Sequence, residues 1–507
     1  MNILAQIVES KKLEIEVLYA QYNLRSLSEE VTSSHHLTLT SSHLLTSPKP
    51  LFYKSLSDAR AAAKPFFITE FKRKSPSEGW IYQDVDLSAQ VRAYAEAGAS
   101  AISILTDEPY FGGTYTDLQQ AREILKAYAE KPNAASPLPL LLQKDFILDP
   151  IQIYLAKLRG ADLILLIAAI LEPAQLDFLR KTAESIGLGV LVEVHDAEEL
   201  AKIQHLDFPV LGINNRDLKT FRTALNRVNV LKQQAGQRFV IAESGVLDDR
   251  HFQMLRKADG FLIGTGLMRN AKAQMPFKLT DHFQSQGRFL FKACGIRTPE
   301  MLAECNEINA PNHAKELPDF IGINFSPVSK RVADAQTREV LKNSTNSKAL
   351  AVFYQNTESE ILEILEKYSF KTIQLYAGDV SPAFVRSLKV RVLLAVKVSD
   401  RLSWNEIFTT QIEPYAADVD CFILDGAKPG SGARILADFP TEFPYPFFLA
   451  GGLHEENLDT VLAYQNCIGV DIASGIETEG MVDFGKIRRI AGGLAVLPLP
   501  HDLSNRF

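Results

Sequence analysis

The sequence predicts an α/β protein built from two tandem (β/α)8 barrels, which are also called TIM barrels. Short aliphatic runs alternate with segments whose apolar residues recur about every 3.6 residues, and this pattern is typical of parallel strands covered by helices. Eight such units occupy roughly 250 residues, the usual size of one barrel, and the 507-residue chain contains this arrangement twice. The length alone predicts two large domains or three ordinary ones.

The first half of the chain contains eight candidate strands. They are expected at Phe66–Phe71, Ala99–Leu105, Leu138–Gln143, Ala161–Ile167, Leu188–Val194, Pro209–Ile213, Arg238–Ala242 and Asp259–Ile263. Segments between them, such as Asp86–Ala97 and Asp196–Ile203, begin with an acidic residue and have the apolar spacing of helices. We therefore expect helices there, with Asp196 as an N-cap.

Residues 1–55 lie before the first strand. We interpret them as one or two additional helices and a Ser/Thr-rich loop over the mouth of the first barrel. His35, His36 and His43 belong to this segment, but they have no carboxylate or cysteine partners nearby. We therefore interpret them as solvated loop residues and not as metal ligands.

The second half repeats the alternation with shorter strands. They are expected at Phe289–Ala293, Asp319–Asn324, Lys348–Phe353, Phe370–Leu375, Arg391–Val396, Asp420–Leu424, Pro446–Leu449 and Cys467–Ile472. The domain boundary is expected in the polar segment Asp281–Arg288, which divides the chain into residues 1–285 and 286–507. Packing between the two barrels is expected to be polar, with no tunnel joining their sites.

Composition and charge exclude several classes of protein. The formal net charge of −7 argues against nucleic acid or an anionic membrane surface as the main partner. Four cysteines without a CxxC pair favour a reducing compartment over a disulfide framework. The N-terminus lacks the features of a secretory signal, and the longest apolar run, Leu163–Leu171, is too short for a membrane span. We expect a cytoplasmic protein, whose oligomeric state the sequence leaves open.

Charged residues recur where the strands of the first half end. In this fold the carboxyl ends of the strands form the active site. Two lysines and three glutamates directed at one barrel mouth are costly unless they are paired or used. The residues with this placement are Glu70, Lys72, Lys144, Glu193 and Glu243, with Asn214 and Arg216 after the sixth strand.

The turns after the seventh and eighth strands are rich in glycine. Ser244-Gly245 and Gly264-Thr265 let backbone N–H groups approach a phosphate closely. This placement predicts a phosphosugar substrate with acid–base chemistry by lysine and glutamate. It does not predict which reaction takes place.

Seven motifs of this half resemble those of indole-3-glycerol-phosphate synthases. In chain order they are TEFKRKSPSEG, ILTDEPYFGGTYTDL, QKDFILDPIQIYLAKLRGAD, LVEVHDAEEL, GINNRDLKTF, AESGV and FLIGTGLMRN. The resemblance implies a synthase that closes an indole ring with loss of CO2 and then of water. It implies no metal and no organic cofactor.

The resemblance also implies roles for single residues. Lys144 would be the general acid of ring closure, and Glu193 and Lys72 would take part in the dehydration. Glu70 and Asn214 would hold the substrate and orient the lysines. The anthranilate and phosphate ends of the site would be shaped by Ser75, Arg216, Glu243, Ser244, Gly245, Gly264 and Thr265. A lysine suits proton donation because its unperturbed pKa is about 10.4. His195 is interpreted as part of a helix start, without a chemical role.

The second half resembles phosphoribosylanthranilate isomerases through KACGIRTPE, IGINFSPVSKRV, FILDGAKPGSGARI, LAGGL and GVDIASGIE. The resemblance implies Cys294 as general base and Asp425 as general acid of an Amadori rearrangement. Arg331 would clamp the substrate, Asp471 would contact it, and Gly452 and Ser474 would belong to phosphate-binding turns. A cysteine acts as a base only as its thiolate, and the free thiol has a pKa of about 8.5. The other cysteines, Cys305, Cys421 and Cys467, are interpreted as buried apolar residues.

Three stretches of the second half depart from the isomerase pattern. Where the family has Gln-Leu-His-Gly at the end of the fourth strand, this chain has Gln374-Leu375-Tyr376-Ala377. A glycine of the sixth-strand loop is replaced by Pro429, and the family's Phe-Asp-Trp is replaced by Ile435-Leu436-Ala437. An alternative is therefore a non-catalytic second barrel that supports a synthase.

Two other enzyme classes compete with these assignments. A lysine in a barrel can also form a Schiff base, but that use needs an amine whose pKa lies near neutral. The neighbouring glutamates favour the charged form of the lysine and therefore oppose this use. A related histidine-pathway isomerase uses aspartate at the first strand, where this chain has Cys294. The implied ligands are small phosphosugar–anthranilate substrates.

Overall fold

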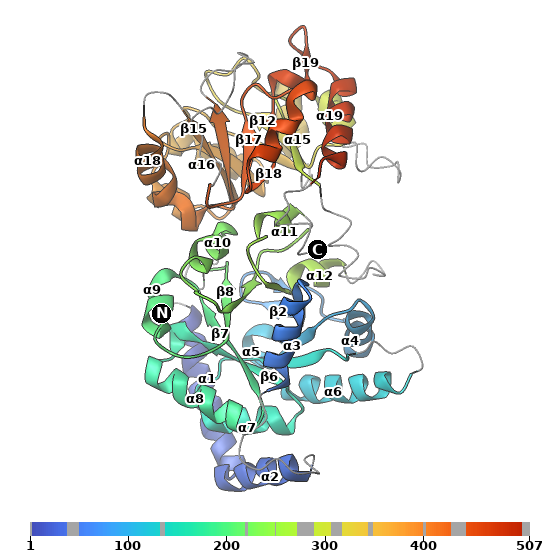
Figure 1. Ribbon diagram of the computed structural model, residues 1–507, viewed down its shortest axis with the longest axis vertical. Coiled ribbons are helices and arrows are strands. Elements are labelled where there is room, and N and C mark those ends of the chain that lie inside the picture. The colour runs from blue at the N-terminus through green and yellow to red at the C-terminus, as the bar shows by residue number, and fades with distance from the viewer. Residues whose placement is uncertain are drawn as a thin grey trace.

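The computed structural model describes residues 3–37, 50–131, 137–217, 222–248, 250–270, 288–305, 317–342, 348–398, 402–426 and 443–498. These residues form two closed eight-stranded barrels, one above the other in Figure 1, and in each barrel all neighbouring strands are parallel. The predicted pair of (β/α)8 barrels is therefore confirmed. The expected boundary at 281–288 falls almost entirely outside the described residues.

All the predicted barrel strands are present, and each end agrees within two residues. The first barrel contains β1 (Phe66–Phe71), β4 (Ala101–Leu105), β5 (Leu140–Lys144), β6 (Leu163–Ile167), β7 (Gly189–Val194), β8 (Val210–Asn214), β9 (Phe239–Glu243) and β10 (Gly260–Ile263). The second contains β11 (Leu290–Cys294), β12 (Phe320–Asn324), β13 (Ala349–Val352), β14 (Thr372–Tyr376), β15 (Arg391–Val398), β16 (Cys421–Gly426), β17 (Phe447–Ala450) and β18 (Cys467–Ile472).

Helices surround both barrels (Figure 1). Around the first lie α4 (Leu87–Glu96), α5 (Glu108–Phe111), α6 (Tyr115–Ala129), α7 (Pro150–Leu158), α8 (Pro173–Ser185), α9 (Ala197–Ile203), α10 (Asn226–Lys232), α11 (Arg250–Met254) and α12 (Thr265–Asn270). Around the second lie α14 (Pro299–Cys305), α15 (Ala335–Lys342), α16 (Glu358–Lys367), α17 (Pro382–Ser387), α18 (Trp404–Ile407) and α19 (Phe484–Val496). Asp196 caps α9 through its side chain, as the sequence predicts, and Asp86 caps α4 in the same way.

Short 3-10 and π segments and two small hairpins complete the described structure. The helical segments are η1 (Ala168–Ile170), η3 (Phe408–Ile412), η4 (Glu413–Asp418), η5 (Glu455–Ala463) and η6 (Ser474–Ile476). The hairpins are β2 (Lys74–Ser75) with β3 (Gly79–Trp80), and β19 (Glu477–Thr478) with β20 (Met481–Val482). The first hairpin belongs to the loop after β1, so it carries side chains over the mouth of the first barrel.

The N-terminal segment differs from the expected cover over the mouth. It forms α1 (Ile3–Gln21), α2 (Leu24–Leu37) and α3 (Leu51–Ala61), so His35 and His36 lie in a helix and not in a loop, while His43 lies outside the described residues. Helix α3 covers the opposite end of the barrel, because Phe52 packs against Phe66 at the start of β1 and beside Gly189 at the start of β7. Of these three helices, α1 approaches the mouth, through the buried Lys11.

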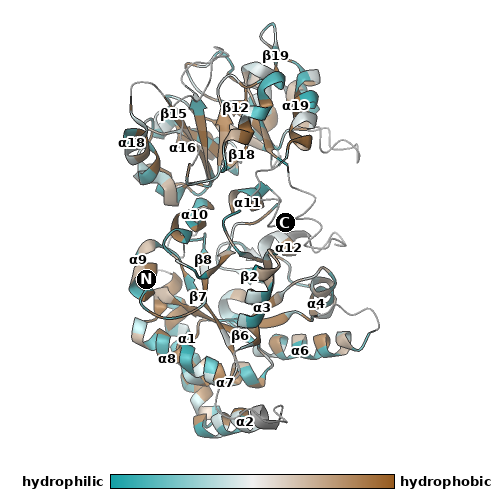
Figure 2. Cartoon of the chain, viewed as in Figure 1, coloured by the Kyte–Doolittle hydropathy of each residue, from teal (hydrophilic) through white to brown (hydrophobic). Residues whose placement is uncertain are grey.

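Buried hydrophobic residues of the strands form the interior of both barrels. In Figure 2 the strands are largely hydrophobic, whereas the outer helices are mixed in character. In the first barrel, alternate strand residues such as Ile68, Leu142 and Leu165 point into the centre and are buried. This packed interior leaves the chemistry to the strand ends.

The second barrel sits with the amino ends of its strands on the mouth of the first (Figure 1). Loops after β8 and β9 reach across: Asn226 N donates to Val419 O at 3.0 Å, and Arg250 Nη1 donates to Asp319 O at 2.8 Å. Arg256 Nη2 donates to Gln465 O at 2.7 Å. These hydrogen bonds are polar, but one continuous cluster of buried apolar side chains contains residues of both barrels, among them Leu255 and Phe448, so the packing is not only polar as the sequence analysis expected. The carboxyl end of the second barrel faces away from the first (Figure 1).

Candidate active sites

A cavity of about 770 Å³ opens at the carboxyl ends of the strands in the first barrel. All the site residues that the sequence suggests for this half line it, namely Glu70, Lys72, Ser75, Lys144, Glu193, Asn214, Arg216, Glu243, Ser244, Gly245, Gly264 and Thr265. They come from six different strands or the loops that follow them. The barrel topology thus brings together residues that are far apart in the sequence.

Lys144 at the end of β5 is held between two glutamates. Its Nζ lies 2.8 Å from Glu243 Oε2 and 3.3 Å from Glu193 Oε2, and both carboxylates are buried. Burial alone lowers the pKa of Lys144, but the charges of Glu243, Glu193 and Glu70 outweigh it and raise this pKa above its ordinary value. Lys144 is therefore a cation at neutral pH and has a proton to donate.

The surroundings of Glu193 and Glu243 shift the pKa values of these two groups in opposite directions. Burial raises the pKa of Glu193, but Lys144 and His195 more than offset it and hold this pKa below its ordinary value. For Glu243, burial is the largest influence and raises the pKa, with Lys144 opposing it and Glu193 adding to it. Glu193 is thus the more permanent anion of the two, which suits a group that must hold a lysine charged.

His195 follows β7 and supports Glu193. Its Nε2 lies 3.0 Å from Glu193 Oε1, and its Nδ1 lies 3.1 Å from Glu199 Oε2. Burial lowers the pKa of His195, but these glutamates outweigh it and raise the pKa to about 10. The sequence analysis gave His195 no chemical role, and it is absent from the cavity lining, so it acts as a support behind Glu193.

Lys72 and Glu70 form a second pair, with Lys72 Nζ 2.5 Å from Glu70 Oε1. The two residues lie two positions apart at the end of β1, so their side chains share one face. Glu70 is buried, which raises its pKa, but Lys72 and Lys144 lower it below the ordinary value. The ion pair fixes where the Lys72 ammonium stands.

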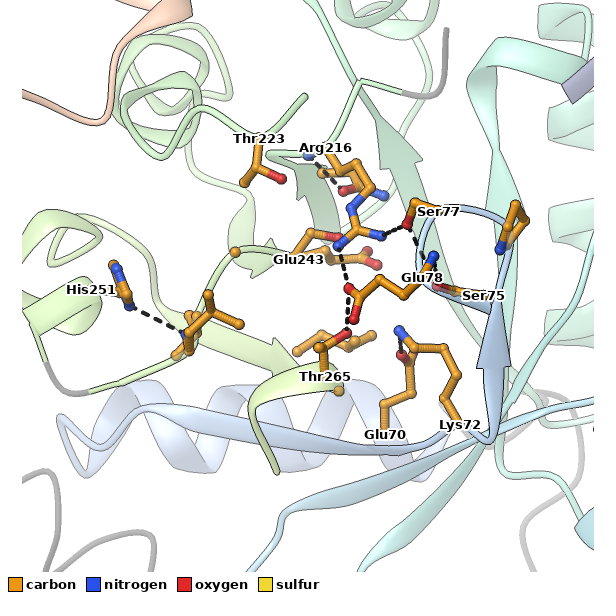
Figure 3. A pocket seen from close by; sticks show the side chains of 18 of the residues that line it. Glu70, Lys72, Ser75, Ser77, Glu78, Arg216, Thr223, Glu243, His251 and Thr265 are labelled. Carbon is orange, nitrogen blue, oxygen red and sulfur yellow. Dashed lines mark hydrogen bonds and ion pairs between the residues drawn. The ribbon is translucent and has the colours of Figure 1, made fainter. Parts of the chain in front are cut away.

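A chain of polar contacts crosses the outer part of the cavity (Figure 3). Arg216 Nη1 donates to Ser77 Oγ at 3.0 Å, and Arg216 Nη2 lies 3.6 Å from Glu78 Oε1. Thr265 Oγ1 donates to the same Glu78 oxygen at 3.4 Å. The sequence analysis missed Ser77 and Glu78, although both stand inside the first quoted motif. Their position in the hairpin loop after β1 is what brings them to the cavity.

The turn after β9 has an unusual backbone. Ser244 has φ +63° and Gly245 has φ +93°, so both residues lie in the left-handed region of backbone conformation. This region is common for glycine but rare for a residue with a side chain such as Ser244. The Ser244 carbonyl accepts from Asn215 Nδ2 at 3.1 Å. Because a peptide group is planar and trans, the Gly245 N–H points away from that donor. This geometry suits an anion-binding turn.

The second barrel holds Cys294 and Lys292 on one face of β11. Lys292 is fully buried, and its Nζ lies 2.7 Å from Asp471 Oδ1 at the end of β18. Burial raises the pKa of the Cys294 thiol, and Lys292 opposes this rise. The sequence analysis assigned no role to Lys292, although the spacing of two residues from Cys294 on a strand indicates a shared face.

Asp425 lies at the end of β16 in the same mouth. Burial, followed by the charge of Asp471, raises the pKa of Asp425 to about 6, while Lys397 and Lys292 oppose the rise. Tyr376, which stands for the expected histidine, packs against Tyr354 with ring centroids 4.8 Å apart. Lys397 Nζ lies 3.6 Å from the Tyr354 ring centroid. An aromatic and cationic wall thus borders the carboxyl group.

The remaining predicted residues of this mouth are Arg331, Gly452 and Ser474. Arg331 forms an ion pair with Glu477, in which its Nε donates to Oε1 and its Nη2 donates to Oε2, each at 2.7 Å. The Arg331 guanidinium therefore already has a carboxylate partner. Gly452 follows β17 with φ +68°, and Ser474 begins η6 after β18. Pro429 and residues 435–437, which depart from the isomerase pattern, lie outside the described residues.

Among the described residues, no helix combines the length and apolarity that a membrane crossing requires. In the same residues, no group of three or more His, Cys, Asp or Glu side chains is arranged to hold a metal ion.

Comparison with protein families divides the chain as the barrels do. Residues 4–278 match the family model of indole-3-glycerol phosphate synthase. Residues 291–492 match the family model of N-(5'-phosphoribosyl)anthranilate isomerase. The two families follow one another in the order that the motifs predict.

Curated relatives carry both units in one chain. The tryptophan biosynthesis protein TrpCF of Vibrio parahaemolyticus is 30% identical over 489 residues, covering 94% of this chain and 94% of the relative. The TrpCF protein of Salmonella typhi is 31% identical over 487 residues, covering 94% of this chain and 95% of the relative. The similarity therefore extends across both barrels and the segment between them.

Proposed function

This chain belongs to the bifunctional tryptophan biosynthesis family that joins indole-3-glycerol phosphate synthase to phosphoribosylanthranilate isomerase, and we propose how its residues divide the two reactions. The enzyme is an isomerase and a decarboxylating lyase. Its C-terminal barrel converts N-(5'-phosphoribosyl)anthranilate to 1-(2-carboxyphenylamino)-1-deoxyribulose 5-phosphate. Its N-terminal barrel converts that open-chain intermediate to indole-3-glycerol phosphate. The two units are residues 1–285 and 286–507.

The observation that carries the synthase proposal is the cationic Lys144 between Glu193 and Glu243. Ring closure needs a proton on the substrate carbonyl oxygen while the aromatic carbon attacks the carbonyl carbon. Lys144 donates that proton, and loss of CO2 then restores the aromatic ring. A Schiff-base role is disfavoured because the neighbouring carboxylates keep this amine protonated and therefore not nucleophilic.

Dehydration follows with Lys72 and Glu193. A hydroxyl leaves as water when an acid protonates it and a base removes a proton from the ring system. Lys72 is the acid and is oriented by Glu70 at 2.5 Å, while the anionic Glu193 is the base and accepts from Asn214 Nδ2 at 3.3 Å. Lys72 follows β1 and Glu193 belongs to β7, so the acid and the base reach the substrate from different sides of the barrel mouth.

The outer part of the cavity binds the ends of the substrate. The Ser244-Gly245 and Gly264-Thr265 turns bind the phosphate through backbone N–H groups. Ser75 and Arg216 lie toward the anthranilate end, where the Arg216 guanidinium pairs with its carboxylate. Glu243 holds Lys144 in place.

The isomerase reaction uses Asp425 and Cys294. Asp425 protonates the ribose ring oxygen, for which its raised pKa of about 6 keeps a useful protonated fraction. Cys294, as thiolate, then removes the proton from C2, and the ammonium of Lys292 favours that thiolate. Arg331 clamps the substrate, Asp471 contacts it, and turns at Gly452 and Ser474 bind its phosphate. Both reactions run without metal or cofactor, in the cytoplasm, on small phosphosugar substrates.

The test follows both reactions in one purified chain. The wild type should consume phosphoribosylanthranilate, seen as loss of anthranilate fluorescence, and should produce indole absorbance. Lys144→Ala should stop at the open-chain intermediate, and Cys294→Ala should leave the starting compound untouched but still use the added intermediate. If the wild type uses only the added intermediate, the second barrel is not an isomerase. Cys305→Ala is the matched control, because Cys305 is buried and outside the mouth.

A further inference from the structure

The cavity of the first barrel is lined in part by the second barrel. Besides its own strand-end residues, the wall includes Lys371, Thr372, Lys389, Val390 and Arg391, which lie at or just before the starts of β14 and β15. The amino end of one barrel therefore closes part of the catalytic mouth of the other. The described residues of the first barrel do not form this cavity alone.

Arg391 makes the most direct of these contacts. It is the first residue of β15, its side chain is 13% exposed, and its Nη2 donates a hydrogen bond to the carbonyl oxygen of Gly245. Gly245 belongs to the left-handed turn after β9 that we assign to phosphate binding. A charged donor makes this a strong hydrogen bond across the domain junction.

The hydrogen bond decides which way the next peptide faces. With the Gly245 carbonyl directed at Arg391, the N–H of Val246 in the same planar peptide points the opposite way. Asn215 holds the preceding peptide in the same manner through the Ser244 carbonyl. Neither the Gly245 nor the Val246 N–H has an acceptor among the described residues, and both residues line the cavity. Two adjacent N–H groups are thus available for one anion.

Contacts between the barrels also position Arg391 and the residues that pack against the turn. Asp420 of the second barrel lies 3.6 Å from Arg391 Nη1 and accepts from Leu225 N at 3.2 Å. Leu225 and Thr223 fill the space where a side chain on Gly245 would stand, at 2.7 Å from a Cβ placed there. One carboxylate of the isomerase barrel therefore orients the arginine and anchors the segment on which the turn rests.

The other end of this loop, at Arg250, also contacts the second barrel. Arg250 pairs with Asp248, donates to the Asp319 carbonyl at 2.8 Å, and lies 4.7 Å from the Phe320 ring centroid. Asp319 and Phe320 belong to the start of the second barrel's β12. The segment from Ser244 to Arg250 is consequently attached to the isomerase barrel at both ends.

We infer that the isomerase barrel completes the phosphate-binding end of the synthase site, with Arg391 as a positioning residue that orients the Ser244–Val246 turn. This inference rests on the proposed phosphate role of that turn. Arg391 acts on the turn and not on the reacting atoms, so its loss should weaken phosphate binding equally in the ground state and the transition state. Such a change raises KM and leaves kcat nearly unaltered.

The experiment uses the full chain with the variant Arg391→Met. The synthase KM for 1-(2-carboxyphenylamino)-1-deoxyribulose 5-phosphate should rise about tenfold, the expected loss when a charge-assisted hydrogen bond is removed. The inhibition constant of inorganic phosphate as a competitor should rise in parallel. The isomerase kcat/KM of the same molecules should stay within about twofold, because its residues lie at the opposite end of the barrel. Arg391→Lys should restore part of the loss, and it decides the question if Arg391→Met does not fold.

Two further variants separate the possible failures. Arg256→Met removes another buried arginine that crosses the junction, to the carbonyls of Gln465 and Cys467, but lies outside the cavity. An equal rise of KM in this control, or an unchanged KM in Arg391→Met and Arg391→Lys, overturns the inference. Gly245→Ala tests the turn itself. If it leaves KM and phosphate inhibition unchanged, the proposed phosphate site fails; if it alters them while the Arg391 variants do not, only the present inference fails.

Discussion

The ammonium of Lys11 lies 2.8 Å from Asp145, the residue that follows Lys144. Lys11 belongs to α1 and is 1% exposed, and it also lies 3.3 Å from Asp107 after β4. A single cation from the N-terminal helix thus neutralises two buried carboxylates at adjacent strand ends. The helix is tied to the catalytic mouth through this contact.

Lys11→Met should destabilise the first barrel by about 3–5 kcal/mol, because removal of one partner leaves buried charges uncompensated. Urea unfolding measures this when Trp80 is the only fluorophore, in a Trp404→Phe background. Lys12→Met is the control, since Lys12 is exposed and pairs only with Glu9 among the described residues. An equal effect of the two substitutions contradicts the role of Lys11.

The same variant predicts a pH dependence. Burial raises the pKa of Asp107 even while Lys11 opposes it, and loss of Lys11 raises that pKa further. A protonated Asp107 no longer needs a cation, so the stability lost in Lys11→Met should be smaller at acidic pH than at neutral pH. Paired urea titrations at the two pH values measure this difference. A loss that is constant with pH would mean that packing, and not charge, is what Lys11 supplies.

The isomerase should show a bell-shaped pH profile of kcat/KM. The active form needs Asp425 protonated and Cys294 as thiolate, and their pKa values lie in the reverse order, about 6 and above the ordinary thiol value. Between these values one proton is shared by the two groups, so the active fraction is small but constant. The rate should fall below about pH 6 as both become protonated, and should fall again at alkaline pH as both lose protons. An acid limb that is absent down to pH 5 would contradict Asp425 as the acid.

Tyr376 should act through its ring. The Tyr376 ring packs against the ring of Tyr354, and Lys397 Nζ lies 5.4 Å from the Tyr376 ring centroid. Tyr376→Phe should keep isomerase kcat/KM within about threefold, whereas Tyr376→Ala should lower it by about tenfold, since an aromatic pair contributes up to about 1.5 kcal/mol beyond its buried area. Steady-state assays with phosphoribosylanthranilate measure both. Equal losses of kcat/KM in the two variants would mean that the Tyr376 hydroxyl, and not its ring, supports the reaction.

The open-chain intermediate should pass through bulk solvent between the sites. The synthase cavity meets the amino ends of the second barrel's strands, whereas Cys294 and Asp425 lie at their carboxyl ends. Buried side chains such as Leu290, Leu393 and Phe448 fill the barrel between the two ends. Labelled phosphoribosylanthranilate turned over with excess unlabelled intermediate should therefore yield unlabelled indole-3-glycerol phosphate at early times. Retention of label in the product would mean that a protected route exists.

Periodicity, turn composition and motif order were sufficient to predict both barrels, their strands and the strand-end residues that line the first cavity. Each of these features is local: an aliphatic run followed by Lys144 or Glu193 marks a strand end, and parallel strands bring such ends to one edge. The expected cover over the mouth was wrong for α3, because the sequence does not say against which end of a barrel an amphipathic helix packs.

Pairings between segments that are distant in the chain had no such local signal. The contacts of Lys11 with Asp145, of Glu78 with Arg216, and of Arg391 with Gly245 join residues from different loops or different domains. They depend on how loops fold over the mouth and on which face of one barrel meets the other. A strand pattern carries no information about that choice, since the same apolar periodicity runs along the whole of each strand.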